Sequence, residues 1–565
     1  MNRTNEKGWM AAAAVALFVI LLWSYPLATM RLAAQWDVGV HLRWAAQFHT
    51  ALQEGWLLPR WAWASLGGLG DPTFFYYQPL FYYITSAFSL VGIEPEYSLL
   101  LSGIVIYGLL AACVYRFLLR HCPPYKAALG AGFVLASPPM FFLATQMSAF
   151  PWVLSFPFSI WFILESLRQR PRPARLAMLI ALVSFSHLLS AMMTLLCTGF
   201  ALLFLVPWNR DAIRRHLAWG GGVALGLCLT AFFFYPAITQ LGLITPEGWT
   251  NGASYDWRRA FAFPVVTYFQ YGLKWFGPQL PFPMLVLLMA GLALLPLKAA
   301  APTPPHSTAR KLAVVALIAL ALGTELAYPL YVVLTPLHKL QFPYRFLFLA
   351  ALLAAMALAL RVHEGAWARW SKPVRALALL LVLAYFGQLA VLQLKLIKDG
   401  RDIPDRASVM AGRFGQPEYV PAVRGPAWTR YLDDGKLEGE CRRLGLACSA
   451  LRQRSHDLSV VIETPRAASV RLPLFAFPAW EASVDGQAQP RAFDPASGLL
   501  QVNLAPGRHV VTVRWARLPA EVAGLWVSAA ALLVWLGLLA VGRRRAALPA
   551  PEAALAPGMK VRVPG

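Results

Sequence analysis

The chain has 565 residues, of which 58% are hydrophobic and only 14% are charged, and its mean hydropathy is +0.53. A soluble globular protein cannot bury that much apolar surface, so we expect most of the chain to lie in a lipid bilayer. The formal net charge of +23 would suggest nucleic acid as the partner of a soluble protein. Here the basic residues fall in short segments between apolar runs, so we expect no nucleic acid as a partner.

Apolar runs of membrane-spanning length recur along the chain and predict about twelve transmembrane helices. The first run ends without an Ala-x-Ala cleavage site and is longer than the core of a signal peptide, so we expect a retained helix. Two adjoining runs, 174–190 and 191–207, are also consistent with one kinked hairpin. The runs are 9–30, 98–120, 126–144, 150–167, 174–190, 191–207, 217–237, 281–298, 311–334, 343–361, 374–394 and 521–542.

Basic residues follow every second apolar run, which predicts that these ends face the cytoplasm. They are Arg116, Arg120 and Lys126; Arg168, Arg170, Arg172 and Arg175; Arg210, Arg214 and Arg215; Lys298, Arg310 and Lys311; Arg361, Arg369, Lys372 and Arg375; and Arg543, Arg544 and Arg545. The loops expected on the opposite, outer side are 31–97, 145–149, 238–280, 335–342 and 395–520. We therefore expect a multi-pass protein of the inner (plasma) membrane whose unusual polar chemistry lies outside.

The first outer loop, 31–97, has two stretches with helical spacing. Residues 38–56 predict a helix lying in the membrane interface, and residues 79–92 predict a second interfacial or re-entrant helix. The aromatic run 74–83 contains Tyr76 and Tyr77, whose rings could stack on a sugar. The alternative is an aromatic belt at the membrane interface.

Residues 395–520 form the one soluble-looking segment, between the membrane module 1–394 and a last helix with a basic tail, 521–565. Its second half alternates with period two and has turn residues at Asp485-Gly486 and Pro506-Gly507, which predicts a small antiparallel β domain on the outer side. Cys441 and Cys448 lie in this segment. They could form a disulfide, or they could be two unpaired thiols.

Asp37 follows the first apolar run and therefore lies at the predicted membrane–water boundary, where a lipid-borne and a water-soluble substrate can meet. A carboxylate there can take the proton from an acceptor hydroxyl. Alternatively, Asp37 is an N-cap of the helix that follows, and one residue could do both. His41 falls one helical turn later and could orient Asp37 or touch a phosphate; the alternative is an interfacial histidine with no role.

A departing phosphate needs cations, and Arg345 is the main candidate because it lies at the outer mouth of a predicted helix among aromatic residues. The alternative for Arg345 is snorkelling of its side chain to the interface. His187, which lies between two apolar runs, is another candidate for substrate or phosphate binding. Alternatively, it satisfies a helix break. Further candidates for phosphate or substrate binding are Arg60, His338, Lys339 and Arg258. Glu247, Asp256 and Glu325 are candidates for a second acid, and spacing does not choose among them.

Several motifs in order resemble a bacterial membrane family, the 6-pyruvoyl-tetrahydropterin synthase-related proteins. These are Trp36-Asp37 with His41, Leu57-Leu58-Pro59-Arg60-Trp61, the segment from Pro72 to Tyr83, and Leu340-Gln341-Phe342-Pro343-Tyr344-Arg345-Phe346. The sequence has no zinc–histidine cluster of a soluble synthase. The C-terminal stretch from Phe477 to Val513 is similar to that of YfhO-like membrane glycosyltransferases. Both families resemble the GT-C superfamily.

This resemblance implies an all-α polytopic GT-C-like bundle with a polyprenyl-phosphate-linked sugar donor, and a glycan, lipid or protein acceptor. It also implies a catalytic acid early in the first outer loop, where Asp37 stands. Metal-dependent members show a second acid in a short motif, whereas Asp37 is alone in Trp36-Asp37-Val38-Gly39. No cofactor is therefore predicted with certainty, although a divalent metal is possible, and one carboxylate suffices for inverting transfer.

Two other functions are compatible with the sequence. A flippase or transporter of lipid-linked sugars would need ionisable residues deep within its helices, and His187 and Glu325 are the possible examples. A noncatalytic assembly protein would present the β domain to partners, but it would leave the polar first loop unexplained. We expect a glycosyltransferase.

Overall fold

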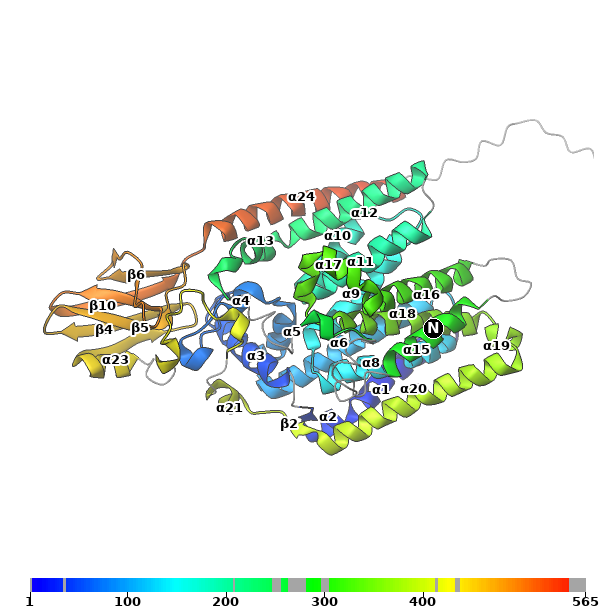
Figure 1. Cartoon of the computed structure of the whole chain (residues 1–565), viewed down its shortest axis with the longest axis horizontal. Helices are drawn as coiled ribbons and strands as arrows, with labels where there is room; N and C mark the ends of the chain where they lie inside the picture. Colours follow the sequence, from blue (N-terminus) through cyan, green and yellow to red (C-terminus); the bar gives the residue numbers. More distant parts are fainter. Residues whose placement is uncertain are drawn as a thin grey trace, which may run out of the picture.

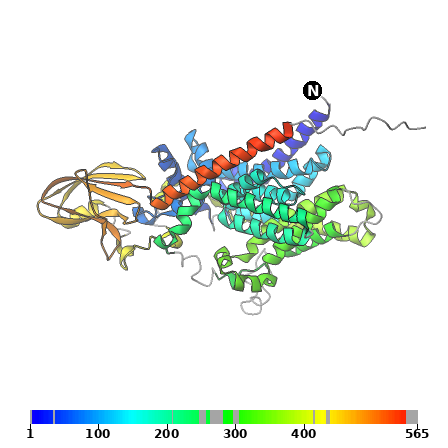
Figure 2. The same cartoon turned by 90° about the horizontal axis from the view of Figure 1, so that it is seen from above.

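The computed structural model describes residues 3–33, 37–206, 209–245, 256–262, 281–295, 304–411, 415–431 and 437–547. Figure 1 shows a body of long helices with a region of β-strands at one end, and Figure 2 shows the same arrangement from above. The helices of the body are α1 (Arg3–Leu22), α2 (Ser24–Thr29), α6 (Pro95–Leu118), α7 (Pro124–Leu135), α8 (Pro138–Phe141), η2 (Phe142–Gln146), α9 (Phe150–Ser166), α10 (Pro173–Ser186), α11 (Leu188–Leu205), α12 (Arg210–Leu229), α13 (Ala231–Thr239), α15 (Pro281–Leu294), α16 (Pro304–Leu322), α17 (Tyr328–Val333), α18 (Phe346–His363), α19 (Ala366–Arg369), α20 (Lys372–Asp399) and α24 (Pro519–Ala547).

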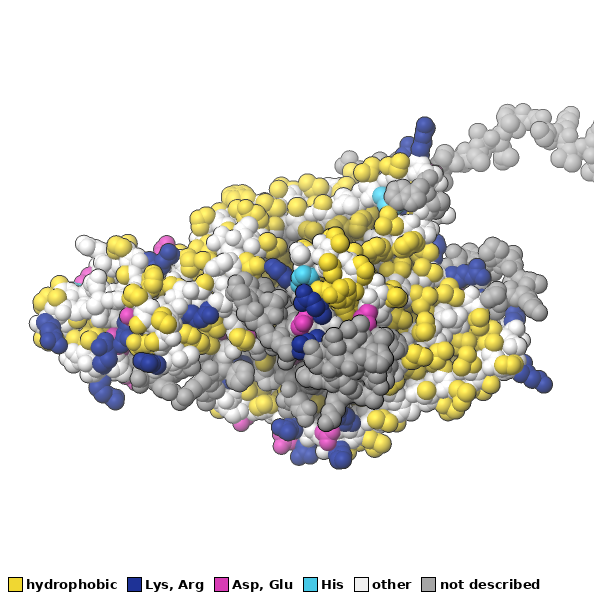
Figure 3. All heavy atoms as spheres, viewed as in Figure 1, with side chains coloured by type: hydrophobic (Ala, Val, Ile, Leu, Met, Phe, Trp, Pro, Cys, Tyr) yellow, Lys and Arg dark blue, Asp and Glu magenta, His cyan; other side chains and the backbone are white. Residues whose placement is uncertain are grey.

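The surface of this body is largely hydrophobic, as the yellow side chains in Figure 3 show. Five helices of the described residues are long and apolar enough to cross a membrane, and up to eight spans result if each of three bent helix pairs counts as one. Shorter apolar helices account for several of the remaining predicted runs. The structure therefore bears out several apolar spans, whereas the count of about twelve stays a prediction.

The three bends coincide with interruptions that the hydropathy pattern does not locate. The α7–α8/η2 pair bends by 58°, the α12–α13 pair by 80°, and the pair formed by Thr308–Leu322 and Glu325–Val333 by 73°. Pro138 begins the second half of the first pair, and a proline cannot donate the backbone hydrogen bond that would continue the preceding helix. Apolar composition is continuous across such a break, so a hydropathy window reads it as a single run.

The basic segments predicted to face one compartment do lie together. Arg120 is within electrostatic reach of Arg116, Arg168 and Arg175, and Arg310 and Arg369 act together on Glu364. Figure 1 shows α19, which contains Arg369, at the end of the helical body away from the strands. The grouping of these basic loops is therefore consistent with the predicted topology. The compartment that each end of the helices faces stays a prediction.

The first loop folds between the helical body and the strands. It contains α3 (Val38–Gln53), α4 (Thr73–Tyr76) and α5 (Leu80–Leu90). The helices predicted at 38–56 and 79–92 are thus present as α3 and α5, which pack against each other, and α5 also packs against α6. The loop is not a loose connection, because Phe48, Phe74, Phe81 and Tyr82 are fully buried.

The β region has two antiparallel sheets with a common core. One has the strand order β3-β4-β10-β6-β7 and the other β5-β9-β8. The predicted alternation and both predicted turns are confirmed. The strands are β3 (Ala447–Gln453), β4 (Asp457–Thr464), β5 (Ala468–Phe475), β6 (Trp480–Val484), β7 (Gln487–Ala488), β8 (Ala492–Phe493), β9 (Leu499–Leu504) and β10 (Gly507–Trp515). A further short pair, β1 (Arg31–Leu32) with β2 (Arg401–Asp402), ties the start of the first loop to the end of α20.

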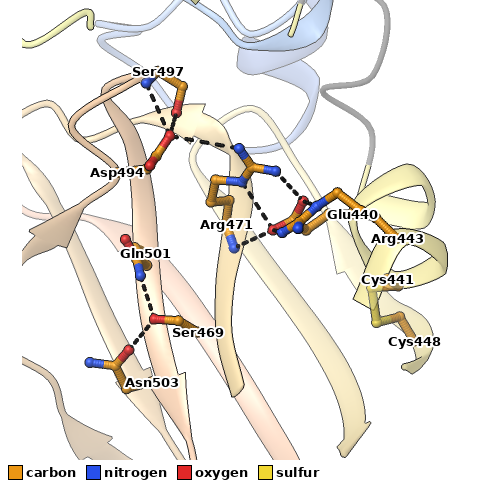
Figure 4. Close-up of polar contacts among 10 residues, drawn as sticks. All are labelled: Glu440, Cys441, Arg443, Cys448, Ser469, Arg471, Asp494, Ser497, Gln501 and Asn503. Atoms are coloured by element: carbon orange, nitrogen blue, oxygen red, sulfur yellow. Dashed lines mark hydrogen bonds and ion pairs between the residues drawn. A yellow bond between two sulfur atoms is a disulfide. The ribbon is translucent and has the colours of Figure 1, made fainter. Parts of the chain in front are cut away.

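A disulfide joins Cys441 in α23 (Leu437–Leu444) to Cys448 in β3, so the disulfide alternative is the correct one. Beside it, Glu440 accepts hydrogen bonds from Arg443 and Arg471 at 2.7 Å each (Figure 4). Arg471 also lies 3.7 Å from Asp494, which accepts a 3.0 Å hydrogen bond from the Ser497 backbone N–H. These contacts fix the loop between β8 and β9.

The β region is not independent of the first loop. Trp61, Leu66 and Leu69 are buried in the same hydrophobic cluster as the inward-facing residues of both sheets. The Trp61 ring lies 5.6 Å from that of Trp480 and 6.0 Å from that of Trp515. Part of the first loop therefore completes the core of the β region, although the division at 394/395 and 520/521 stays a prediction.

Candidate functional site

Asp37 is held in place by its backbone, and its side chain is left available. Its N–H donates to the Met147 carbonyl at 3.2 Å, and its carbonyl accepts the His41 N–H at 2.8 Å. Met147 follows η2, a π-helical turn, and such turns often lie at functional sites. Asp37 occupies the N-cap position of α3, but its carboxylate makes no capping hydrogen bond. The interpretation of Asp37 as a pure side-chain cap is therefore wrong.

The Asp37 carboxylate lies in a half-buried position with one cation nearby. Burial raises the pKa of Asp37 to about 6, although the positive charge of Arg345 acts in the opposite direction. Tyr77, Tyr82, Tyr344 and Glu418 are also within electrostatic reach of Asp37. A carboxyl with this pKa is mostly ionised at neutral pH and is still basic enough to accept a proton.

Arg345 comes from a different part of the chain, between η11 (Pro343–Arg345) and α18. Its guanidinium donates to the Leu340 carbonyl at 3.0 Å and lies over the rings of Trp152 and Phe342, at 5.4 and 5.0 Å. Its Nε is buried without a hydrogen-bond partner. Among the described residues Arg345 forms no ion pair within 4.0 Å, so Asp37 and Arg345 are near each other but not neutralised by direct contact.

His187 joins this group from the break between α10 and α11. Its ring stacks on Trp152 at 5.7 Å with an interplanar angle of 16°, so Trp152 has Arg345 and His187 as neighbours. The His187 Nδ1 also accepts the Ser190 N–H at 3.2 Å and lies 2.8 Å from its hydroxyl. His187 therefore caps α11 and satisfies the helix break, as one interpretation predicted, and it also lies beside Arg345.

His41 is buried in an aromatic cluster near the start of α3. Its Nδ1 lies 2.9 Å from the Tyr82 hydroxyl, and its ring is near those of Trp44 and Tyr77. Burial lowers the pKa of His41 to about 3, so the imidazole is neutral. The side-chain partner of His41 is Tyr82 and not Asp37, and a catalytic role for His41 stays a prediction.

Known proteins give one family assignment. Residues 74–396, more than half of the chain, match the family described as the 6-pyruvoyl-tetrahydropterin synthase related domain, a membrane protein. The chain belongs to this family. The matched part contains Tyr77, His187 and Arg345, whereas Asp37 and Glu418 lie outside it. No curated protein sequence matches the chain.

Two cryo-EM structures of the arabinofuranosyltransferase AftD from mycobacteria, one of them a mutant, are similar to it in outline. Each shares 15% sequence identity with this chain at a TM-score of 0.45, covering 92% of this chain. The chain spans 40% and 42% of the lengths of those two chains. No conclusion about activity follows from a likeness this low.

The remaining residues singled out in this member of the family lie in three places. Tyr77 is near Asp37 and Trp44, with its ring 4.8 Å from that of Trp44. Tyr76 points elsewhere, since its hydroxyl donates to the Gln240 carbonyl at 2.7 Å. Arg60 does not join the site, because it is only 2% exposed and forms a 3.0 Å ion pair with Glu521 in α24.

His338, Lys339 and Arg258 form a second group near the surface. The His338 ring stacks on Trp257 at 4.9 Å, and the Arg258 guanidinium lies 4.9 Å from the same ring and pairs with Asp256 at 3.3 Å. Figure 3 shows basic side chains and a histidine gathered near the middle of the visible face. Tyr331 connects this second group with Arg345. Its ring stacks on that of Trp257 at 5.3 Å, and its hydroxyl is within electrostatic reach of Arg345.

Two of the three acids predicted as candidates for a second site residue lie among the described residues. Asp256 is paired with arginines, Glu325 lies at the bend before α17, and Glu247 lies outside the described residues. The described part of the chain contains no group of three or more His, Cys, Asp or Glu residues that could hold a metal ion. An acid within electrostatic reach of Asp37 is Glu418, in η12 (Pro417–Tyr419). It was not among the predicted residues, because nothing in Gln416-Pro417-Glu418-Tyr419 marks it.

Proposed function

We propose that the protein is a membrane glycosyltransferase that moves a sugar from a polyprenyl-phosphate donor to a hydroxyl-bearing acceptor. The observation that carries this proposal is the approach of Asp37 and Arg345 from distant parts of the chain without direct pairing. A base and a cation that do not neutralise each other by direct contact are both available to substrate groups, the base to a hydroxyl group and the cation to a phosphate.

The reaction follows from these two groups. The Asp37 carboxylate takes the proton of the acceptor hydroxyl, whose oxygen forms a bond to the anomeric carbon of the sugar. The bond from that carbon to the phosphate oxygen breaks, and its electron pair leaves with the polyprenyl phosphate. Arg345 stabilises the growing negative charge with its free Nε–H. One displacement with one base inverts the anomeric configuration, and Asp37 then loses the proton to water.

The proposed orientation puts the site and the β region on the extracytoplasmic side of a bacterial inner membrane. It is supported by the collection of basic loops at the opposite end of the helices, since cytoplasmic loops carry the excess of Lys and Arg. The Cys441–Cys448 disulfide supports the same orientation, because disulfides persist in oxidising compartments. Membrane lipid surrounds the helices in this arrangement.

The test is sugar transfer by the purified protein in liposomes. A panel of radiolabelled polyprenyl-phosphate monosaccharides serves as donor, and a panel of glycans, lipids and peptides as acceptor. We expect transfer by the wild type, loss by at least about a hundredfold in Asp37→Asn, and no change in Asp211→Asn, an exposed aspartate in the first turn of α12. Full activity of Asp37→Asn would remove the proposed base.

One observation favours a second candidate, a flippase of lipid-linked sugars. His187 and Glu325 lie at helix breaks, and discontinuous helices form the substrate sites of many transporters. A flippase moves a fluorescent polyprenyl-phosphate lipid between the leaflets of a liposome without transferring its sugar. Movement that persists in Asp37→Asn, together with no transfer by the wild type, would favour the flippase.

A further inference from the structure

A short segment connects the candidate site with the β region. We call residues 415–427 the strap; it precedes η13 (Trp428–Arg430) in the sequence. The Ala422 N–H donates to the Leu243 carbonyl at 2.9 Å, and Pro421 forms a β-bridge with Ile244. The Thr245 hydroxyl donates to the Pro417 carbonyl at 3.1 Å. The strap is thus fixed to the chain that follows α13.

The other end of the strap is fixed to the loop between β8 and β9. A Cβ at Gly425 would lie 2.3 Å from the Ala496 backbone, so only glycine allows this approach, and the Ala427 N–H donates to the Ala496 carbonyl at 2.9 Å. Likewise, a Cβ at Gly498, whose φ is +78°, would lie 2.3 Å from the Val423 carbonyl oxygen. Asp494 and Ser497 hold the same loop (Figure 4). The β region therefore sets the position of the strap.

The strap delivers Tyr419 into the aromatic cluster beside Asp37. Its buried ring lies 6.1 Å from that of Trp44 and 6.5 Å from that of Tyr77, and it stacks on Tyr76 at 6.4 Å with an angle of 15°. These four rings come from three separate segments of the chain. Aromatic faces of this kind are suitable for stacking on the apolar faces of sugar rings.

Glu418 is adjacent to Tyr419 and brings a second carboxylate to the site. It is half-buried, and burial raises its pKa; its own backbone N–H acts in the opposite direction, and the negative charge of Asp37 raises the pKa again. Asp71 is the other acid within electrostatic reach of Glu418. In the described residues no ion pair neutralises Asp37 or Glu418.

The two charged side chains within electrostatic reach of Asp37 are therefore of opposite sign. Arg345 attracts a phosphate, whereas Glu418 repels an anion that approaches it. A carboxylate accepts hydrogen bonds from sugar hydroxyls, and Glu418 is adjacent in the sequence to Tyr419 of the aromatic cluster. This combination fits a neutral, hydroxyl-rich molecule and disfavours a phosphorylated or carboxylated one.

We propose that Glu418, carried by the strap next to Tyr419, is a positioning residue for the acceptor, and that the acceptor is a neutral saccharide. This inference rests on the proposed glycosyltransferase function. Glu418 accepts hydrogen bonds from acceptor hydroxyls that do not react, and it thereby directs the reacting hydroxyl toward Asp37. The β region, which fixes the strap, then takes part in acceptor binding through this one segment.

The test compares Glu418→Gln with Glu481→Gln, an exposed glutamate on β6 that serves as the matched control. Binding of a panel of neutral oligosaccharides is followed by tryptophan fluorescence, because Trp44 lies in the cluster. We expect Glu418→Gln to weaken this binding by about tenfold or more. Binding of a long-chain polyprenyl monophosphate should be unchanged or tighter, since a negative charge is removed. Equal behaviour of the two variants, or weaker phosphate binding in Glu418→Gln, would overturn the proposal.

Kinetics provide a readout that a merely structural role would not change. Removing the Glu418 charge makes ionisation of Asp37 easier, so the acid limb of the pH–rate profile should move to lower pH. The KM for the acceptor should rise, and the KM for the donor should be unchanged. The other groups that face Asp37, namely Arg345, Tyr77, Tyr82 and Tyr344, are the same in both variants. An unmoved acid limb with an unchanged acceptor KM would contradict the proposal. Full transfer by Asp37→Asn would instead reject the proposed function, whatever Glu418→Gln does.

Discussion

Arg60 and Glu521 form a 3.0 Å ion pair that joins the first loop to the start of the last helix, and their side chains are only 2% and 5% exposed. Arg60 also donates to the Phe232 carbonyl of α13 at 2.9 Å, and its guanidinium lies 5.2 and 5.0 Å from the rings of Phe75 and Phe233. Glu521 accepts the Leu518 N–H at 3.0 Å. One buried pair therefore holds together the loop, α13 and α24.

Replacing only one residue of this ion pair should lower the stability of the protein more than replacing both residues. We expect Arg60→Met to destabilise the protein by about 3–5 kcal/mol, because Glu521 is left as an unpaired buried charge. The double variant Arg60→Met/Glu521→Leu should regain most of that loss, since no charge remains without a partner. Thermal unfolding in detergent measures both, with Arg508→Gln on the exposed face of β10 as control. A single variant as stable as the wild type would contradict the prediction.

Arg345 should bind phosphate through both its charge and its shape. We expect Arg345→Gln to weaken binding of a long-chain polyprenyl monophosphate by more than about tenfold. Arg345→Lys should lie between this variant and the wild type, because lysine keeps the charge but loses the planar fork and the stacking on Trp152. Isothermal titration calorimetry measures the binding. A Gln variant that binds as tightly as Arg508→Gln would leave Arg345 as an interfacial arginine only.

The local features of this chain were predictable, because they depend on residues that are close together in the sequence. The alternation in β4, β5, β9 and β10, the turns before β7 and β10, and the amphipathic helices α3 and α5 all follow from neighbouring residues. Asp37 and Arg345, predicted separately as base and phosphate-binding cation, lie within electrostatic reach of each other, but both roles stay predictions.

The features that were not predictable depend on contacts between distant segments. Arg60 looked like a phosphate ligand because its partner, Glu521, is 461 residues away. Glu418 lies in a connecting segment with no motif, and only the strap's attachment to α13 and to the β region brings it to Asp37. The number of spans stays a prediction, since helices that bend at a break keep their apolar composition on both sides.

The pH dependence of transfer should report the ionisation of Asp37. A general base must be deprotonated, and the pKa of Asp37 is about 6, so kcat/KM should rise with pH and level off above that value. The rise should be absent from any residual activity of Asp37→Asn. An acid limb near pH 4, the ordinary range of a free carboxyl, would show that Asp37 is not the group that titrates.

The Cys441–Cys448 disulfide should stabilise the β region and leave the helices unaffected. For a closed loop this short, the chain-entropy relation gives about 2–3 kcal/mol. We expect Cys441→Ser/Cys448→Ser to lower the unfolding temperature of the β region. Mass spectrometry after alkylation should find these two thiols blocked until a reductant is added. Alkylation of both without a reductant would mean that the disulfide does not form in the membrane-inserted protein.

The buried Asp71 should make stability depend on pH. Its side chain is 0% exposed, burial raises its pKa to about 7, and its Oδ1 accepts the Thr73 N–H at 3.0 Å. An unfolded aspartate titrates near about 3.9. The folded state therefore binds the proton more tightly, and the stability from this group is complete below about pH 4 and is lost as pH rises through about 7.

Asp71→Asn removes this dependence, because asparagine stays neutral and keeps an acceptor for the Thr73 N–H. The unfolding temperature of Asp71→Asn relative to the wild type should therefore be higher at pH 8 than at pH 5. Each unit of pH between the two pKa values changes the free energy of unfolding by up to about 1.4 kcal/mol. The exposed Asp211→Asn should show no such trend. A difference between Asp71→Asn and the wild type that does not vary with pH would mean that Asp71 is already ionised in the folded protein.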